Sequence, residues 1–419
     1  MKVLKLTPYY APERISSSHL TADMEDAYVE AGIVSEVYAP TPTRGISDEE
    51  YKTYKTIKYE EKRNGLIQIH RFPMFREGRN PVGRALRYVL VNLVHYHKGV
   101  HAKDVDVIVA GSTPPTQGVL CALVAKRLSK KYKRPVPFIF SLQDMFPESL
   151  ATTGLCKKSS ILYKIGGKIS DYTYRHATRI RVISDSMKET LIKKGVPAEK
   201  ITVIYNWIDT DATIPVAREN NPLFDELGLA RDKFYVTYAG NLGNSQNVDI
   251  MLSCAEVLKD KEDIRFVIFG GGSEKDRFEK QITDSGLTNV HLFPLQPMER
   301  VSQVYSLGNV SFVTCKKGVG VGAFPSKTVS IMATSTPVIA SFDLDSDLCR
   351  ILTENEAGLC ADAEDVQGAV DAILTLYNDR EQCCRLGDNA RTLACTCFSK
   401  EASTAANIAL LNKELVIPI

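Results

Sequence analysis

The chain has 419 residues, more than one hydrophobic core usually organises, so two domains of about 200 residues each are expected. With 44% hydrophobic and 24% charged residues it is typical of a globular protein, and no apolar run approaches the roughly 18 residues of a membrane-spanning helix. Residues 1–206 carry 33 Lys and Arg against 20 Asp and Glu, whereas residues 207–419 carry 19 against 30. Such a basic first half suits nucleic acid, an anionic membrane or the acidic second half as a partner.

The apolar start of the chain is interpreted as a β-strand near residues 2–8. It is not expected to be a signal peptide, because Pro8 and polar residues interrupt the apolar run too soon. Further strands are expected near residues 34–39, 66–72, 105–110, 136–142, 179–184 and 201–205. Helical patterns are found at residues 115–131, 162–175 and 185–194. Residues 40–65 carry Pro, Gly and a Lys- and Glu-rich run, and are interpreted as a surface insertion.

The alternation restarts in the second half, with strands expected near residues 234–239, 264–269, 290–295, 310–314 and 338–341. Near-continuous runs of Val, Ile and Phe separated by helices indicate parallel sheets that are buried on both faces. We therefore expect an α/β protein with two doubly wound, Rossmann-like domains that face each other across a cleft. Residues 207–232 are interpreted as a polar linker between the domains.

Cysteine and histidine spacings give no sign of a metal site. The ten cysteines are scattered, and neither Cys383-Cys384 nor Cys395-Thr396-Cys397 has the Cys-x-x-Cys spacing of a zinc or redox site. His95, His97 and His101 also lack such a spacing. Buried or incidental thiols in a reducing cytosol are expected.

Asp144 follows the strand predicted at 136–142 and should point from a strand end into the cleft. A carboxylate there could accept a proton from an acceptor hydroxyl or stabilise positive charge on a donor sugar. The alternative is a helix cap, because a short helical pattern begins nearby. Glu148 is a second catalytic candidate. The candidates for contact with phosphate in the first strand-to-helix loop are Ser17, Ser18 and His19.

Glycine-rich loops follow three predicted strands of the second half, at the edge where open α/β sheets bind ligands. They are Gly240-Asn241-Leu242-Gly243, Gly270-Gly271-Gly272 and the glycines Gly318, Gly320 and Gly322. Any one of them alone is typical of a turn. Three at one sheet edge favour close approach of the backbone to a phosphate-bearing ligand.

The third loop runs into Pro325-Ser326-Lys327 and a helical pattern at residues 328–333. The free amides and positive dipole end of a helix start attract anions, and Lys327 adds a full charge. The alternative is a capped loop with a solvated lysine. Neither the Gly-x-Gly-x-x-Gly fingerprint nor a P-loop sequence occurs, which argues against a dehydrogenase or an ATPase.

A series of short motifs runs in order through nearly the whole chain. In the first half the motifs are Tyr9-Tyr10-Ala11-Pro12-Glu13, Ser112-Thr113-Pro114-Pro115, Asp144-Met145-Phe146-Pro147-Glu148-Ser149 and Val182-Ile183-Ser184-Asp185-Ser186-Met187. In the second half they are Asn206-Trp207-Ile208-Asp209, Tyr238-Ala239-Gly240-Asn241-Leu242-Gly243, Phe269-Gly270-Gly271-Gly272 and Pro325-Ser326-Lys327. The series resembles the retaining GT-B-fold glycosyltransferases of family four, in a bacterial polysaccharide subgroup similar to the N-acetylfucosaminyl transferases.

The resemblance implies an acceptor-binding domain at residues 1–206 and a nucleotide-sugar donor-binding domain at 207–398, with a last helix, 399–416, that crosses back onto the first domain. It implies transfer of a hexosyl or N-acetylhexosaminyl group with retention of configuration, a UDP-sugar as the favoured donor, and no metal cofactor. The donor-binding residues that it implies are Gly240, Asn241, Gly243, Gly270, Gly271, Gly272, Pro325, Ser326, Lys327 and Ser330.

Two departures from the family pattern affect the donor site. Many relatives carry two glutamates separated by seven residues where this chain has Gly322 and Ser330, and Arg and Lys where it has Asn241 and Gln246. Lys327 and backbone amides are then expected to carry the contact with the donor diphosphate.

A basic, partly amphipathic stretch at residues 71–103 suits an anionic bilayer surface. By the resemblance, the acceptor is a saccharide on a lipid diphosphate, in capsule, exopolysaccharide or O-antigen synthesis. The protein is therefore expected in the cytoplasm, peripheral to the inner face of the cell membrane. The residues expected to bind the anionic surface are Arg79, Arg84, Arg87 and Lys98. A buried domain helix with solvated arginines is the alternative.

Two other functions remain open from the sequence. A GT-B-like 2-epimerase of sugar nucleotides would use the same cleft, but it needs acidic and histidine groups that the sequence does not place there. A non-catalytic nucleic-acid-binding protein would use the basic half. No reader motif or stacking aromatics occur in that stretch, so no nucleic-acid partner is expected.

Overall fold

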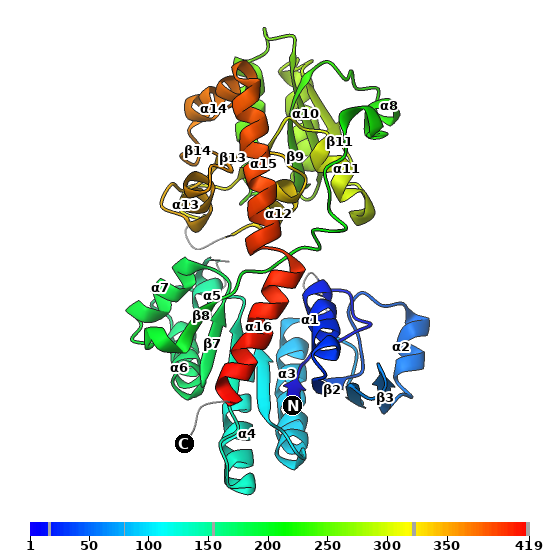
Figure 1. Cartoon of the computed structure of the whole chain (residues 1–419), viewed down its shortest axis with the longest axis vertical. Helices are drawn as coiled ribbons and strands as arrows, with labels where there is room; N and C mark the ends of the chain where they lie inside the picture. Colours follow the sequence, from blue (N-terminus) through cyan, green and yellow to red (C-terminus); the bar gives the residue numbers. More distant parts are fainter. Residues whose placement is uncertain (16–17, 79, 153–155, 321–323, 416–419) are drawn as a thin grey trace. The chain divides into compact units, whose positions relative to one another are not determined.

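The computed structural model describes residues 1–15, 18–78, 80–152, 156–320 and 324–415 (Figure 1). The chain forms two compact units, Met1–Ile204 with Thr404–Ile419, and Tyr205–Ser403. The boundary lies two residues from the expected one. The last helix, α16 (Lys400–Leu415), enters the first unit at Thr404.

The first unit contains an eight-stranded sheet in the order β3-β4-β2-β1-β5-β6-β7-β8. Its strands are β1 (Lys2–Leu6), β2 (Val34–Pro40), β3 (Tyr59–Lys62), β4 (Ile67–Phe72), β5 (Val107–Gly111), β6 (Phe138–Leu142), β7 (Arg179–Val182) and β8 (Ile201–Val203). All neighbours are parallel except β3 and β4. The doubly wound α/β architecture is therefore confirmed for this half.

Residues 40–65 are more ordered than the surface insertion expected from the sequence. They form α2 (Asp48–Tyr54) and the antiparallel edge strand β3. Ser47 begins α2 with a capping box, in which its hydroxyl accepts from the Glu50 amide and the Glu50 carboxylate accepts from the Ser47 amide. The strand escaped prediction because its sequence, Tyr-Glu-Glu-Lys, has no apolar pattern.

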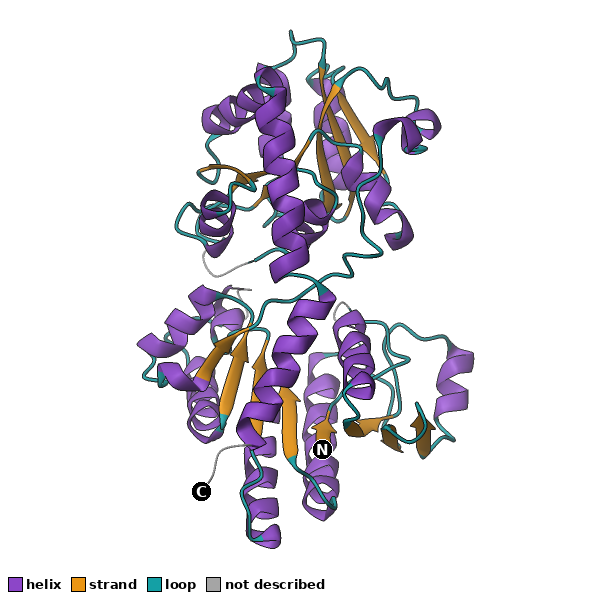
Figure 2. Ribbon diagram, viewed as in Figure 1, coloured by secondary structure: helices purple, strands orange, loops and turns teal. Residues whose placement is uncertain are grey.

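Helices cover both faces of the first sheet (Figure 2). They are α1 (Ser18–Glu30), α3 (Pro81–His101), α4 (Gln117–Tyr132), α5 (Glu148–Thr152), α6 (Ile161–His176), α7 (Asp185–Lys193) and the one-turn 3-10 helix Ala198–Lys200. Alternate residues of β1 face opposite sides, as the two-residue period of a strand requires. Val3 packs with α1 and with Leu410 and Leu411 of α16, whereas Leu4 packs with α4.

The second unit contains a six-stranded, fully parallel sheet in the order β11-β10-β9-β12-β13-β14. Its strands are β9 (Phe234–Asn241), β10 (Ile264–Gly271), β11 (Val290–Phe293), β12 (Val310–Thr314), β13 (Val338–Ser341) and β14 (Gly358–Ala361). Its helices are α8 (Leu223–Glu226), α9 (Asp249–Val257), α10 (Lys275–Asp284), α11 (Val301–Ser306), α12 (Ser326–Ala333), α13 (Asp347–Glu354), α14 (Val366–Asn378), α15 (Arg380–Cys397) and the 3-10 turns Arg218–Asn220 and Met298–Arg300. The sequence missed only the short strand β14, and the predicted architecture is confirmed.

Residues 207–232 are not a free linker, as the sequence suggested, but part of the second unit. Leu223 and Phe224 are fully buried in its core, together with Leu229. Asn221 is also buried, and its amide donates to the Gln303 carbonyl at 2.7 Å. These apolar side chains, set among polar neighbours, fix the segment against the sheet.

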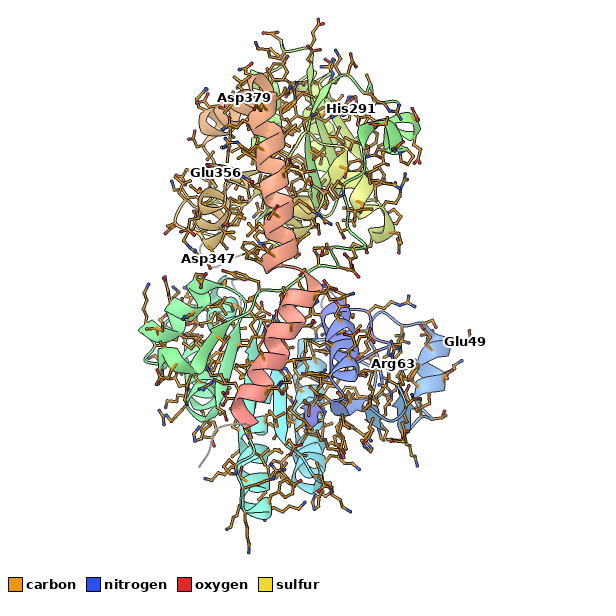
Figure 3. The ribbon with its side chains drawn as sticks, viewed as in Figure 1. Glu49, Arg63, His291, Asp347, Glu356 and Asp379 are labelled. Carbon is orange, nitrogen blue, oxygen red and sulfur yellow. The ribbon has the colours of Figure 1, made fainter. Side chains whose placement is uncertain are left out.

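Two acidic residues of the second unit, Asp379 and Glu356, interact with α15 (Figure 3). The Asp379 carboxylate accepts a hydrogen bond from the Gln382 amide and so caps α15. Glu356, beyond the end of α13, pairs with Arg385 at 3.0 Å. Part of the acidic excess of this half therefore has a local structural role.

Candidate functional site

Two glycine loops lie side by side at the carboxyl edge of the second sheet. The parallel register of β9 and β10 pairs Gly240 with Gly270 and Asn241 with Gly271. Gly272 has a φ of +143°, and a Cβ atom there would lie 2.5 Å from the Asn241 Oδ1 atom. The loops can approach each other this closely only without a side chain at that position.

The third glycine loop is already bound to a carboxylate that the sequence did not indicate. Asp343 follows β13 in the sequence and is buried. Its carboxylate accepts hydrogen bonds from the Gly318 amide at 2.8 Å and the Gly320 amide at 2.7 Å. These two amides are therefore not free to bind a phosphate, which corrects the expectation for this loop. Gly322 lies outside the described residues.

Lys327 lies in the first turn of α12, which follows the third loop. Its Nζ atom is buried and lies 3.8 Å from the centre of the Tyr238 ring. Within the described part of the chain, Nζ has no hydrogen-bond partner. A Cβ atom built on Gly240 would lie 3.5 Å from Nζ, so the ammonium group stands directly beside the β9 loop.

Lys327 is in an unfavourable electrostatic setting. Burial lowers the pKa of its amine to about 7. The first turn of α12 contains no acidic residue, and a cation at the positive end of a helix dipole is destabilised. An anion beside Gly240 would relieve both effects. Pro325 immediately precedes α12, Ser326 is exposed and Ser330 is half-buried, so the structure gathers these predicted residues around the helix start.

The remaining predicted donor residues shape the loop rather than project from it. Asn241 donates weakly to Gln246 across 3.4 Å, so the two positions that carry Arg and Lys in many relatives contact each other here. A Cβ atom on Gly243 would lie 2.6 Å from the Asn241 amide nitrogen, and one on Gly270 2.5 Å from the Leu242 side chain. Gly271 has more room, with its nearest neighbour, Leu295, at 3.5 Å.

The two carboxylates predicted in the first unit differ sharply. Asp144 is exposed after β6, and its carboxylate has no hydrogen-bond or ion-pair partner among the described residues. The adjacent Gln143 amide donates to the Ser112 hydroxyl at 3.2 Å, which ties this strand end to that of β5. Glu148 instead pairs with Lys194 and accepts from the Tyr163 hydroxyl at 3.4 Å. Of the two carboxylates, Asp144 is therefore the one that no described residue holds, and it suits contact with a ligand better.

The first strand-to-helix loop is held by its own side chains. The Ser18 hydroxyl accepts from the Ile15 amide at 2.8 Å and donates to the Glu13 carbonyl at 3.0 Å. His19 is exposed in the first turn of α1. Ser17 lies outside the described residues. The contact of Ser18 and His19 with phosphate stays a prediction.

Sequence reasoning missed Tyr238 and Asp343. Tyr238 stands in the quoted motif before Gly240, and its hydroxyl donates to the Asn241 carbonyl at 2.9 Å, which holds the ring beneath Lys327. Its place two residues before the glycine was the available signal. Asp343 follows β13 and carried no signal of its own. No group of three or more metal-ligating side chains occurs in the described part of the chain.

Two family models match the chain. The model "Glycosyltransferase Family 4" matches residues 18–212, and the model "Glycosyl transferases group 1" matches residues 219–393. The chain is similar to the probable glycosyltransferase WbjE of Pseudomonas aeruginosa, with 26% identity over 61% of this chain and 62% of that protein. It is also similar to the putative colanic acid biosynthesis glycosyl transferase WcaI of Escherichia coli, with 28% identity over 56% of this chain and 58% of that protein. The match thus spans about three fifths of the length of these relatives.

Solved structures share the fold over nearly the whole chain. Sucrose-phosphate synthase from Thermosynechococcus elongatus superposes with a TM-score of 0.71 at 15% identity, covering 99% of this chain and 98% of that one. HepE from Anabaena, in complex with UDP, superposes with a TM-score of 0.70 at 17% identity, covering 99% and 100%. These likenesses establish the two-domain fold.

Proposed function

We propose that this chain, which belongs to the glycosyltransferases of GT-B type, transfers a sugar from a nucleotide sugar to a saccharide acceptor in bacterial polysaccharide synthesis. The observation that carries the proposal is the buried ammonium group of Lys327. It has no hydrogen-bond partner within the described residues and stands beside the glycine loops of β9 and β10. A donor phosphate would supply the missing partner through a charge-assisted hydrogen bond.

A UDP-sugar is the donor that we favour. HepE, which shares the fold, was solved in complexes with UDP and with UDP-glucose. In this chain the phosphates would lie between Lys327 and the backbone at Gly240, with Ser330 available to the ribose. The nucleotide sugar acts as a substrate, and the proposal includes no metal cofactor, because Lys327 and the start of α12 would balance the diphosphate charge.

Asp144 is our candidate for the chemical step. An exposed carboxylate without a counter-ion can accept the proton of an acceptor hydroxyl or stabilise positive charge on the donor sugar. Glu148 is less suited to this role, because Lys194 already holds it. The proposal includes retention of configuration at the transferred carbon, on the strength of the family resemblance. The test is to compare the anomeric configuration of the product, measured from NMR couplings at its anomeric carbon, with that of the donor sugar.

We further propose a lipid-linked acceptor and contact with an anionic membrane surface at the inner leaflet. The support is an apolar face on α3, where Val82, Leu86, Val89 and Leu93 are 54% to 76% exposed. Their spacing places them on one side of the helix, as in helices that lie in a membrane interface. No described helix is long and apolar enough to cross a membrane.

This geometry corrects the cationic surface expected from the sequence. Arg87 is fully buried and Arg84 is paired with Glu77, so neither is the unpaired surface charge that the sequence suggested for contact with a bilayer. Arg79 lies outside the described residues, and Lys98 is exposed near the end of α3. Membrane contact should therefore depend on the apolar face more than on arginine charge, and part of it should resist high salt.

The donor proposal is tested by a thermal-shift screen with UDP-, GDP- and dTDP-sugars, followed by measurement of nucleotide release with saccharide acceptors. A true donor at about 100 times its dissociation constant should add about 2.7 kcal/mol to the free energy of unfolding. UDP-sugars should stabilise the protein most. If no nucleotide sugar stabilises it, the proposed function is wrong.

The membrane proposal is tested by flotation with anionic vesicles. The double variant Leu86→Ser/Leu93→Ser should lose most of its vesicle binding, since each buried leucine contributes about 1.5–3 kcal/mol. The matched control is Ile214→Ser/Leu344→Ser, which changes two exposed apolar side chains of the second unit. Equal flotation of the two double variants would exclude this surface.

A further inference from the structure

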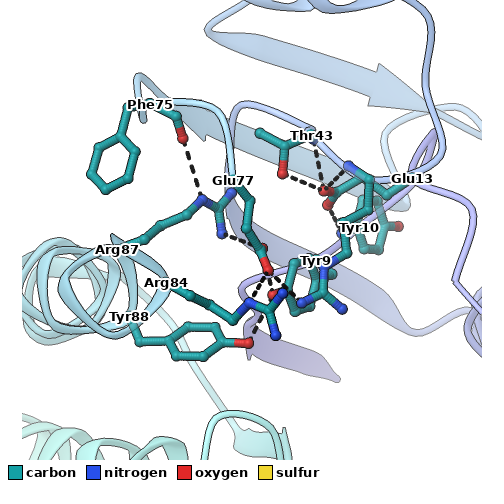
Figure 4. Close-up of polar contacts among 10 residues, drawn as sticks. Tyr9, Tyr10, Glu13, Thr43, Phe75, Glu77, Arg84, Arg87 and Tyr88 are labelled. Atoms are coloured by element: carbon teal, nitrogen blue, oxygen red, sulfur yellow. Dashed lines mark hydrogen bonds and ion pairs between the residues drawn. The ribbon is translucent and has the colours of Figure 1, made fainter. Parts of the chain in front are cut away.

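A cluster of charged side chains at the carboxyl edge of the first sheet has more cations than anions (Figure 4). We call it the Glu77 cluster. Three guanidinium groups converge on the Glu77 carboxylate: Arg44 at 2.5 Å, Arg84 at 3.0 Å and Arg87 at 3.6 Å. The Tyr9 hydroxyl donates to the same carboxylate at 2.7 Å and shares a hydrogen bond of 2.8 Å with the Tyr88 hydroxyl.

The cluster is assembled from segments far apart in the sequence. Tyr9 follows β1, Arg44 follows β2, Glu77 follows β4, and Arg84 and Arg87 lie on α3. A second carboxylate fixes the two loops that bring Tyr9 and Arg44 together. Glu13 is buried and accepts from the backbone amides of Tyr10 at 3.0 Å, Thr43 at 2.7 Å and Arg44 at 3.0 Å.

Arg87 is the member that a simple ion pair does not explain. Its side chain is fully buried, yet neither terminal nitrogen has a hydrogen-bond partner among the described residues. Its Nε atom donates to the Phe75 carbonyl at 3.4 Å. A buried guanidinium with unsatisfied donors is costly. Glu13 also interacts electrostatically with Arg87, but two carboxylates still face three guanidinium groups.

The rest of the cluster leaves the excess charge accessible. The Arg44 and Arg84 side chains are 36% and 44% exposed, so an incoming anion can reach them from solvent. The Glu77 carboxylate would repel such an anion, but it neutralises one guanidinium and holds the other two in position. A guanidinium group can donate two parallel hydrogen bonds to two oxygens of one phosphate. The hydroxyls of Tyr9 and Tyr88 lie within the same cluster and could donate as well.

We infer that the Glu77 cluster binds the phosphate group of a lipid-linked acceptor. The inference rests on the proposed function. Leu86 of the apolar face directly precedes Arg87 on α3, so one helix presents both an apolar surface and a site for an anion. That pairing fits an amphiphile with a phosphate head. In the sheet order, β1 and β2, which lead to Tyr9 and Arg44, are two and three strands from β6. At the usual strand spacing these are about 10 and about 14 Å, so the phosphate would bind one sugar or more from Asp144.

The test uses calorimetry with pyrophosphate in the Lys327→Ala background, where anion binding at the donor site is weakened. This protein should still bind pyrophosphate, and adding Arg84→Gln should weaken that binding about tenfold or more. The matched control is Arg134→Gln, an equally exposed arginine that pairs with a single carboxylate, Asp106, at the opposite edge of the same sheet. Arg134→Gln should leave the affinity unchanged.

A second arm identifies the source of the phosphate. Farnesyl diphosphate should bind more tightly than pyrophosphate, and Leu86→Ser should abolish the difference. Equal affinity for the two ligands would exclude a lipid. Absence of pyrophosphate binding in Lys327→Ala, or equal binding by the Arg84→Gln and Arg134→Gln proteins, would overturn the site and leave Glu77 as a structural ion pair. Neither failure affects the donor proposal, which is tested at Lys327.

Discussion

The two units of the chain hold unbalanced positive charge in different ways. In the second unit a single lysine, Lys327, is buried without a hydrogen-bond partner among the described residues, and its pKa falls to about 7. In the first unit three arginines share the Glu77 carboxylate. Because a guanidinium group does not deprotonate in this range, the first site stays charged at any physiological pH, whereas the second gains its charge with a proton.

The comparison separates what each site can do. A lysine that is half neutral when empty can adjust its charge to a ligand that binds and leaves, as a nucleotide product must. The Glu77 cluster is already charged when it is empty, so anion binding there should take up no proton, whereas anion binding at Lys327 should. The predictions that follow break or sharpen this contrast, beginning with the largest expected effect.

Removal of the shared carboxylate should destabilise the first unit strongly. Glu77→Ala leaves buried Arg87 without its counter-ion, and breaking a buried pair in this way typically costs about 3–5 kcal/mol. Chemical denaturation would measure the loss. The control, Asp26→Ala, removes an exposed partner of Arg63 and should cost less than about 1 kcal/mol. Similar losses in the two variants would mean that Arg87 does not need Glu77.

Asp144→Asn should lower the turnover number about a hundredfold while donor affinity barely changes, because the carboxylate would act on the reacting groups and not on the nucleotide. Steady-state kinetics together with donor calorimetry would measure both quantities. If the side chain has no part in the chemistry, asparagine should be nearly neutral, since the carboxylate makes no hydrogen bond or ion pair with the described residues. Turnover close to that of the unmodified protein would remove Asp144 from the proposed chemistry.

Lys327→Ala should weaken UDP-sugar binding by roughly 1.5–3 kcal/mol, the usual value of a hydrogen bond to a charged group, without unfolding the second unit. Lys261→Ala is the matched control, because this exposed lysine lies just before β10, at the opposite edge of the same sheet. Calorimetry gives the affinity and thermal unfolding gives the stability. An unchanged affinity in Lys327→Ala would remove the lysine from the donor site.

The fold was predictable because Val-, Ile- and Phe-rich strands dominate both sheets, and strand ends locate the site in this architecture. The strands β3 and β14 were not predictable from the sequence. They are polar or very short and show no alternating pattern of apolar residues. The Pro325–Lys327 motif pointed to an anion site, but its neighbour Tyr238 was recognised only from the structure. The sequence treated Arg84 and Arg87 alike as surface charges, because burial depends on which face of α3 meets the sheet.

Long-range partners account for the rest of the difference. The Asp343 carboxylate accepts hydrogen bonds from the Gly318 and Gly320 amides. From the local sequence alone, these amides were expected to bind a phosphate. The Glu77 cluster joins residues from four separate segments, so no spacing in the sequence predicts it. In both cases a tertiary contact decides which charges and donors are available.

The central claim is that the donor phosphate is the counter-ion of Lys327, and proton-linked calorimetry tests it most directly. With a free pKa of about 7, the amine is about nine-tenths neutral at pH 8, and phosphate binding should raise that pKa. UDP-sugar binding measured at pH 8 in buffers of different ionisation enthalpy should therefore show uptake of nearly one proton. Lys327→Arg, which keeps its charge, should take up none. Absence of proton uptake by the unmodified protein, or equal uptake by the variant, would contradict the account.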